Sequence, residues 1–159
     1  MSDMRNPLRG RGATDNPVNR FEGNYIDYDV DEETGEKPSP KTQLIRDDTK
    51  SVITYNKSED ISFNASINPY RGCEHGCIYC YARPYHEFLG YSSGLDFESK
   101  IVVKYDAPQL LKKELSSPKW KPQVIAMSGV TDVYQPLEKK LEITRGCLEV
   151  LAEFRNPVG

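Results

Sequence analysis

The sequence predicts an α/β fold whose strands and helices alternate from about Asp60 onward. Three observations predict it: an alternating apolar segment at residues 61–67, a continuous apolar run at residues 101–103, and two later segments with helical spacing of apolar residues. Strands that alternate with helices form parallel sheets with right-handed crossovers. We therefore expect three βα units in residues 61–159.

The expected strands differ in their apolar pattern. Pro69 ends the first, in which every second residue is apolar: Ile61, Phe63, Ala65 and Ile67. The second, at residues 101–103, is continuously apolar, as in a strand that is buried on both faces. The third is expected at residues 124–127. A fourth strand is expected to begin where the chain stops, at Gly159, so the sequence looks cut short.

Each of the last two strands is followed by a predicted helix. Asp106 is the expected N-cap of the first helix, with Pro108 in its first turn and Gln109 placed for a capping box. A single long helix is expected after the third strand and ends at residues 156–157. One face of that helix is apolar and carries Leu137, Leu141, Thr144, Leu148 and Leu151.

Residues 1–60 look like a polar extension to the packed domain of residues 61–159. The extension begins with basic residues and continues into an acidic run between Glu22 and Glu36. Such a segment buries too little apolar surface to offset the entropy lost on ordering. We expect it to be a flexible tail or a segment that wraps over the domain surface. The basic residues at its start are Arg5, Arg9, Arg11 and Arg20.

Composition limits the classes of function. The 159 residues carry a net charge of -3, so bulk charge does not favour nucleic acid as a partner. Residues 1–12 contain no apolar run typical of a secretory signal, and no stretch approaches the ~20 apolar residues that cross a bilayer. We therefore expect no membrane association and a cytoplasmic, reducing location. Three of the four cysteines lie within eight residues, which in that compartment indicates metal or redox chemistry.

The clustered cysteines are Cys73, Cys77 and Cys80, with the spacing C-x3-C-x2-C. Thiolates are the usual ligands of iron–sulfur clusters. Gly72 and Gly76 allow the backbone to bend tightly around a bulky inorganic core. Three ligands this close in sequence can hold three irons of a four-iron cube and leave the fourth iron open.

Two other readings of the cysteines remain open. A zinc-stabilised binding module could use the same three thiolates with His75 or His86 as the fourth ligand, although a second CxxC pair is missing. A one-electron carrier is the other alternative, but the fourth nearby cysteine and the proline of a ferredoxin are absent. Cys147 lies on the apolar side of the last helix and is expected to be a small buried hydrophobe.

The residues around the cysteines resemble the spore photoproduct lyase-like branch of the radical S-adenosylmethionine (SAM) proteins, often labelled DNA repair photolyases. The resemblance begins with Asn-Pro-Tyr-Arg-Gly-Cys at residues 68–73 and runs to Cys-Tyr-Ala-Arg at 80–83. It includes Gly-Leu-Asp-Phe-Glu at 94–98 and Thr-Asp-Val-Tyr-Gln-Pro-Leu-Glu at 131–138. It also reaches back to Arg-Gly-Ala at 11–13 and Asn-Pro at 16–17. The chain would cover about the first half of that family's partial (β/α) barrel.

The resemblance implies a [4Fe–4S] cluster on the three cysteines and SAM on its open iron. It also implies an electron donor such as a flavodoxin or ferredoxin, and reductive cleavage of SAM to a 5′-deoxyadenosyl radical that abstracts a hydrogen. Tyr79 would pack near the adenine, with ordinary core packing as the alternative. Thr131 and Asp132 would lie in the SAM or substrate pocket at the end of the third strand, with helix capping by Asp132 as the alternative.

The sequence departs from that family at Gly129, which aligns with the hydrogen-donor cysteine of spore photoproduct lyases. The departure weakens the case for that repair reaction, so a DNA-repair role would rest on fold analogy alone. We expect the substrate pocket to lie largely beyond Gly159 and the 159-residue chain to be inactive by itself. Any DNA binding is expected to be weak and to come mostly from the N-terminal arginines.

Overall fold

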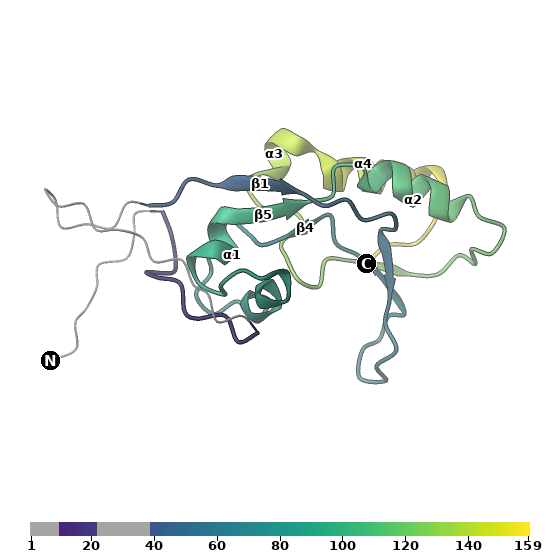
Figure 1. The fold of residues 1–159 in the computed structure, drawn as a ribbon. Helices are drawn as coiled ribbons and strands as arrows, with labels where there is room; N and C mark the ends of the chain where they lie inside the picture. The colour runs from purple at the N-terminus through teal and green to yellow at the C-terminus, as the bar shows by residue number, and fades with distance from the viewer. Residues whose placement is uncertain (1–9, 22–38) are drawn as a thin grey trace, which may run out of the picture. The chain divides into compact units, whose positions relative to one another are not determined.

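The computed structural model describes residues 10–21 and 39–159 and has a mixed α/β fold (Figure 1). The chain forms two compact units, and each is described by itself. Unit 1 comprises Met1–Ile45 and Gly72–Ile101, and unit 2 comprises Arg46–Arg71 and Val102–Gly159. The six strands found in these described residues form two three-stranded sheets with the orders β1-β5-β4 and β2-β3-β6.

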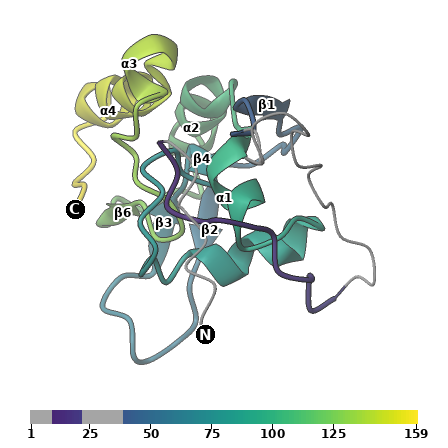
Figure 2. The same cartoon turned by 90° about the vertical axis from the view of Figure 1, so that its left-hand side faces the viewer.

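One sheet lies within unit 2 and contains two of the three predicted strands (Figure 2). Strand β2 (Ile53–Tyr55) pairs antiparallel with β3 (Ala65–Ile67), and β3 pairs in parallel with β6 (Ile125–Met127). The parallel register aligns Ala65 with Ile125 and Ile67 with Met127. The first and third predicted strands are therefore parallel neighbours, although β3 is shorter than the pattern at residues 61–67 predicts.

The end of the chain runs alongside β6. Val158 forms a parallel bridge with Ile125, whose backbone N–H donates to the carbonyl of Pro157 at 3.1 Å. Gly159 continues the ladder, because its N–H donates to the Ile125 carbonyl at 3.1 Å and its carbonyl accepts from Met127 at 2.8 Å. A further parallel element thus begins beside β6 at the place where the sequence predicts the next strand.

The remaining predicted strand does not join that sheet. Strand β5 (Lys100–Val103) forms as expected and is buried along its length, but it pairs antiparallel with β4 (Tyr70–Arg71). The other neighbour of β5 in its sheet is β1 (Gln43–Arg46). The expectation of one parallel sheet from the three predicted strands is therefore wrong. A buried apolar run suits either kind of sheet, so it does not reveal the direction in which the strand pairs. The strands described in residues 10–21 and 39–159 form two separate sheets and no closed barrel.

Helices α2 (Ala107–Leu115) and α4 (Ile143–Glu153) pack against each other in unit 2 (Figure 1). Gly146 allows the close approach, because a Cβ there would lie 2.8 Å from Pro108 Cγ. Asp106 precedes α2, but it makes no side-chain cap, and its carboxylate pairs with Arg46 instead. The predicted capping box is therefore wrong, whereas the helix itself is confirmed.

The single long helix expected after β6 is two helices. Helix α3 (Glu138–Leu141) is separated from α4 by Glu142, whose φ of 52° is in the left-handed region. The buried Glu138 carboxylate accepts hydrogen bonds from the first amides of α4, at Thr144 and Arg145, both at 3.0 Å. These contacts satisfy backbone donors that a continuous helix would pair internally.

Parts of the expected extension are ordered. Strands β1 and β2 both lie within residues 1–60, and residues 10–21 run across α1 (Leu95–Ser99) in unit 1 (Figure 2). The backbone N–H of Leu95 donates to the carbonyl of Asp15 at 3.1 Å. Arg5, Arg9 and the acidic run from Glu22 to Glu36 lie outside the described residues. In the described part of the chain, no helix is long and apolar enough to cross a membrane.

Candidate functional site

The three clustered cysteines lie on one loop of unit 1, between β4 and the 3-10 helix η1 (Arg83–Leu89). All three are free thiols, and Cys73 is buried while Cys77 and Cys80 are half-buried. The loop is fastened by the N–H of Cys73, which donates to the carbonyl of Phe97 at 2.9 Å. It continues as a tight turn in which the N–H of Cys80 donates to the carbonyl of Cys77 at 3.2 Å.

Gly72 and Gly76 bend the loop as the sequence predicts. Their φ angles are 83° and 64°, which side chains rarely tolerate. Space is also lacking, because a Cβ at Gly72 would lie 2.9 Å from the carbonyl oxygen of Phe97. The one at Gly76 would lie 2.8 Å from Oε2 of Glu98. The loop therefore needs glycine at both positions.

The donor types on the loop suit a thiophilic metal or an iron–sulfur cluster. Three thiols and no disulfide are present in this segment. As the loop stands, no group of three or more His, Cys, Asp or Glu side chains within residues 10–21 and 39–159 is arranged to hold a metal ion. The chemistry of the residues therefore fits such a group, and binding would require the thiols to draw together.

The two histidines considered as zinc ligands have different surroundings. His75 is exposed on the loop. His86 is 2% exposed and lies among aromatic rings, 5.4 Å from Tyr91 and 5.6 Å from Phe97 between ring centroids. Neither of its ring nitrogens has a well-formed hydrogen bond among the described residues. Burial lowers the pKa of His86 to about 4, so its imidazole is neutral at pH 7.

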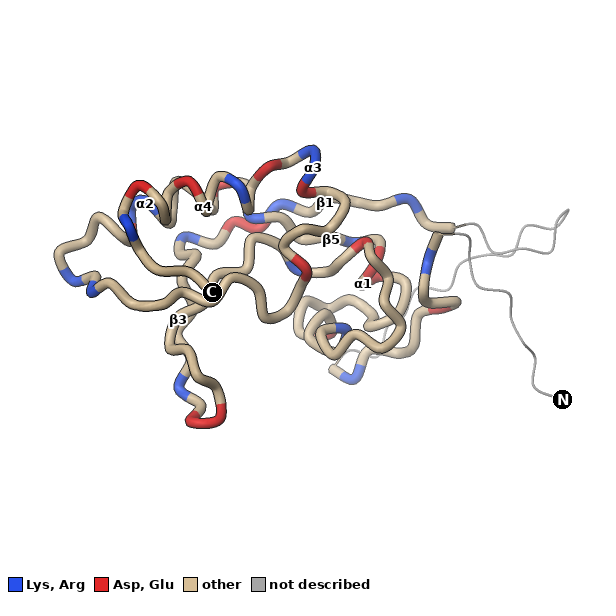
Figure 3. The backbone as a smooth tube through the Cα atoms, turned by 180° about the vertical axis from the view of Figure 1, so that it is seen from behind, with Lys and Arg blue, Asp and Glu red and all other residues tan. Residues whose placement is uncertain are grey.

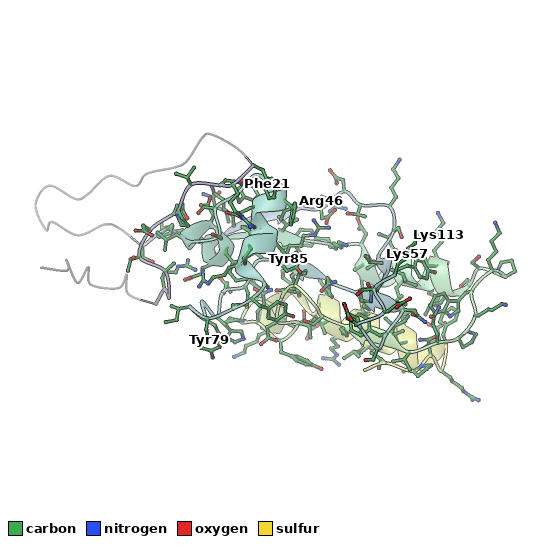
Figure 4. All side chains as sticks on the ribbon, turned by 90° about the horizontal axis from the view of Figure 1, so that it is seen from below. Phe21, Arg46, Lys57, Tyr79, Tyr85 and Lys113 are labelled. Carbon is green, nitrogen blue, oxygen red and sulfur yellow. The ribbon has the colours of Figure 1, made fainter. Side chains whose placement is uncertain are left out.

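Tyr79 points away from the body of unit 1 (Figure 4) and is 87% exposed. The alternative that it is an ordinary core residue is therefore wrong. Its neighbours Ile78 and Tyr81 are also exposed, at 73% and 70%. Apolar side chains this exposed, next to three thiols, form a surface that a ligand or partner could cover.

Arg83 and Glu98 form a buried ion pair beneath the cysteine loop. The Arg83 side chain is 10% exposed and that of Glu98 is 0% exposed. Arg83 Nε donates to the carbonyl of Cys77 at 2.9 Å, while its Nη1 donates to the carbonyls of Ser93 and Gly94 at 3.2 and 3.1 Å. The guanidinium also lies over the ring of Phe97, 5.1 Å from its centroid. Arg83 thus links the loop to the segment that leads into α1.

Asp96, on the same helix as Glu98, forms a second buried network. Its Oδ1 accepts from the Asn16 side-chain amide at 3.0 Å, and its own backbone N–H donates to Asn16 Oδ1 at 2.9 Å. Lys100 Nζ lies 3.1 Å from Asp96 Oδ1, and the N–H of Ser92 donates to Oδ2 at 3.1 Å. The sequence pattern gives no role to Arg83, Asp96 or Glu98. A pattern of charged residues does not reveal which side chains the fold places beside each of them.

Thr131 and Asp132 belong to unit 2, in the loop that follows β6. Thr131 is buried, and its Oγ1 accepts from Gln135 Nε2 at 3.3 Å. Asp132 Oδ1 accepts from the backbone N–H of Tyr134 at 2.8 Å, which is a local turn contact rather than a helix cap, since the N-cap of α3 is Leu137. Both residues follow β6, the third predicted strand, as the sequence predicts.

The loop after β6 also contacts the residue that follows β3. Val130 N–H donates to Asn68 Oδ1 at 3.3 Å, and Ser128 N–H donates to the carbonyl of Ile67 at 3.0 Å. Ser128 has a φ of 88°, which is uncommon for a residue with a side chain. The carboxyl ends of two parallel strands thus meet through Asn68 and Ser128, which sequence analysis did not single out.

Two of the four N-terminal arginines are engaged within unit 1. Arg11 Nη1 donates to the carbonyl of Glu98 at 2.6 Å, and Arg20 pairs with the buried carboxylate of Glu87. Phe21 stacks on Phe88, with ring centroids 4.8 Å apart. The carboxylate of Glu87 therefore partly neutralises the charge of Arg20, whereas the donors of Arg11 are engaged with neutral acceptors.

The chain is similar to uncharacterized proteins of Mycobacterium bovis and Mycobacterium tuberculosis, each 38% identical over 98 residues. That match covers 62% of this chain and 29% of each relative. An uncharacterized protein of Methanocaldococcus jannaschii is 34% identical over 109 residues, which is 69% of this chain and 38% of that protein. The matched part of the chain therefore spans about a third of the length of these relatives. No family model and no solved structure matches it.

Proposed function

We propose that this chain is part of a radical SAM enzyme in which Cys73, Cys77 and Cys80 hold a [4Fe–4S] cluster. The observation that carries the proposal is the single loop of three free thiols, bent by two positive-φ glycines and fastened from below by Arg83. When bound, the cluster supplies one electron to SAM, whose S–C5′ bond breaks to leave methionine and a 5′-deoxyadenosyl radical.

The chain's own residues would bind and orient the reactants. The exposed ring of Tyr79 offers a face for the adenine of SAM. The exposed Ile78 and Tyr81 beside it leave the loop open to an electron donor such as a flavodoxin or ferredoxin. Thr131 and Asp132 would contribute to the SAM or substrate pocket from the loop after β6. A reducing cytoplasmic location is part of this proposal, since it would keep the thiols free.

The proposed architecture is the N-terminal part of a partial (β/α) barrel. The parallel pair β3–β6 and the parallel bridge from Ile125 to Val158 support it. Strand β6 runs parallel to β3, and the chain at Val158 runs parallel to β6, as successive strands of such a barrel do. The relatives are about twice as long as this chain, so the complete barrel and its substrate pocket belong to the proposal for the longer protein.

A nucleic-acid substrate has little support from charge. Figure 3 shows both signs of charge interspersed along α2, α3 and α4, rather than a face of one sign. The Gly129 position also holds no thiol where spore photoproduct lyases have their hydrogen donor. We therefore propose a radical reaction other than the spore-type repair, with DNA bound weakly and in a salt-dependent way.

Anaerobic reconstitution with iron and sulfide tests the cluster. We expect about four irons and four sulfides per chain, with a brown colour. Replacing Cys73, Cys77 or Cys80 by Ala should abolish uptake, whereas Cys147→Ala should not. Stoichiometric zinc with no uptake of iron would instead support the zinc-stabilised binding module.

Reductive cleavage of SAM separates the enzyme from a simple electron carrier. A longer chain with the same N-terminal residues should form 5′-deoxyadenosine from SAM and a chemical reductant, and this chain should form little or none. A reconstituted longer chain that is reduced but neither binds nor cleaves SAM would be a one-electron carrier.

A further inference from the structure

The proposed function uses Arg83 only as a support beneath the cysteine loop, but Arg83 is itself bonded to a residue that contacts the N-terminal segment. The buried guanidinium of Arg83 donates to four acceptors, one of which is the carbonyl of the proposed ligand Cys77. The side chain of its partner Glu98 is completely buried, so the loss of the Arg83 guanidinium would leave an unpaired buried carboxylate. Burial and these four acceptors hold the Arg83 side chain in place beneath the loop.

The other contacts of Glu98 come from the N-terminal segment, residues 11–15. Glu98 Oε2 accepts from the N–H of Gly12 at 2.9 Å, and Oε1 accepts from the N–H of Ala13 at 2.8 Å. Both oxygens of this carboxylate are thus occupied, one of them by both Ala13 and Arg83. The buried side chain of Glu98 therefore joins the N-terminal segment to Arg83, which contacts the cysteine loop.

A second connection reaches the loop beside Cys73. Arg11 Nη2 donates to Thr42 Oγ1 at 3.2 Å, and the Thr42 hydroxyl donates to Glu74 Oε1 at 2.6 Å. Arg11 Nη2 also donates to the carbonyl of Pro40 at 2.7 Å. The N-terminal segment is therefore tied to the loop through two independent sets of side chains.

The segment also packs directly on the loop backbone. A Cβ at Gly12 would lie 1.7 Å from the carbonyl oxygen of Gly76, which stands between Cys73 and Cys77. A Cβ at Gly94 would lie 2.1 Å from the carbonyl oxygen of Asp15. The first distance shows that the N-terminal segment lies directly against the loop at Gly76, and the second that it also lies directly against Gly94, which precedes α1.

From these contacts we propose that Arg83, held by Glu98, is a positioning residue for the cysteine loop. We also propose that residues 11–15 act as a clamp, which means that their contacts hold the cysteine loop against unit 1. The loop needs such support because its two positive-φ glycines lower its own preference for one conformation. The clamp is a property of the metal-free chain, while its importance for holding a cluster rests on the proposed function.

Thiol alkylation of the metal-free full chain tests the clamp without any cluster. Cys73 is buried in unit 1 and reports opening of the loop, while Cys147 is buried in unit 2 and reports global unfolding. We expect Arg83→Met and Gly12→Ala each to raise the alkylation rate of Cys73 on the order of tenfold, with that of Cys147 unchanged. Mass spectrometry of the labelled peptides follows each cysteine separately.

Arg145→Met is the matched control, because Arg145 forms an exposed ion pair with Glu149 at 3.1 Å. It should leave both rates unchanged. No change at Cys73 in Arg83→Met and Gly12→Ala would overturn the proposal. Equal acceleration at Cys73 and Cys147 would also overturn it, because the ion pair would then stabilise the whole chain rather than the loop.

Reconstitution then links the clamp to the cluster. Arg83→Met should retain fewer irons per chain than the unmodified protein after gel filtration, and Arg145→Met should retain the same number. If the unmodified protein takes up no iron, the proposed function fails, and the alkylation result still decides the clamp. Equal iron retention in Arg83→Met and the unmodified protein would overturn the role of Arg83 in holding the cluster.

Discussion

The carboxylate of Glu138 accepts a hydrogen bond from the backbone N–H of Thr144 at 3.0 Å, across the kink that separates α3 from α4. Glu138 also accepts from the N–H of Arg145 and from the hydroxyl of Tyr70, which is fully buried. Burial, with the nearby Glu138 carboxylate, raises the pKa of Tyr70. One acidic side chain thus begins a helix and satisfies a core hydroxyl.

We predict that Glu138→Ala destabilises the protein by about 2–4 kcal/mol, because it leaves two helix amides and a buried hydroxyl without their acceptor. Urea unfolding followed by circular dichroism gives the change in free energy. Glu149→Ala, which removes an exposed carboxylate, should cost about 0.5 kcal/mol or less. Similar losses for the two variants would contradict the role assigned to Glu138.

Lowering the pH should destabilise unit 1 through His86. Its pKa falls from 6.5 to about 4 on folding, so the unfolded chain binds a proton that the folded chain does not. The contribution is fully present above pH 6.5 and is lost as pH falls toward 4, by roughly 1.4 kcal/mol per pH unit.

The measurement is the free energy of unfolding of the protein and of His86→Leu between pH 4 and 7. The free energy of unfolding of the protein should fall relative to that of His86→Leu as the pH falls, because only the protein with His86 loses this contribution. Parallel curves would show that His86 takes up its proton equally in the folded and unfolded states.

Cys147 should be the least reactive of the four thiols. It is 0% exposed, and burial raises its pKa to about 12, so only about one molecule in ten thousand carries the thiolate at pH 8. In the metal-free chain, iodoacetamide should modify the half-buried Cys77 and Cys80 at least about tenfold faster. Rapid labelling of Cys147 in the folded protein would contradict this order.

Two glycines should respond differently to an added methyl group. Gly94→Ala would place a Cβ 2.1 Å from the carbonyl oxygen of Asp15, so we predict a loss of about 1–3 kcal/mol. A Cβ at Gly129 would meet nothing closer than 3.7 Å, at Asn68 Oδ1, so Gly129→Ala should change stability by about 0.5 kcal/mol or less. Thermal unfolding of both variants measures the difference.

Gly129→Cys should fold for the same reason that Gly129→Ala does. The position therefore has room for a thiol, and its glycine is not required by packing in the described structure. A strongly destabilised Gly129→Cys variant would contradict this conclusion.

The sequence by itself determined the local elements that depend on near neighbours. The apolar run at residues 101–103 is a buried strand, residues 107–115 are a helix with Pro108 in its first turn, and residues 125–127 are a strand. The glycines at 72 and 76 bend the cysteine loop as predicted. These features follow from apolar spacing, proline geometry and the conformational freedom of glycine, which act over a few residues.

Only the tertiary structure decided which strands pair and which polar residues are buried. The burial pattern of residues 101–103 does not distinguish pairing with β4 from pairing with β3 or β6, so the division into two sheets could not be read from it. Arg11 and Arg83 look like ordinary surface cations in a polar sequence, yet both contact Glu98, which lies 87 and 15 residues away along the chain. Contacts at such separations depend on where the backbone brings the groups together. Burial of the Arg83–Glu98 ion pair means that removal of either partner would leave an unpaired buried charge.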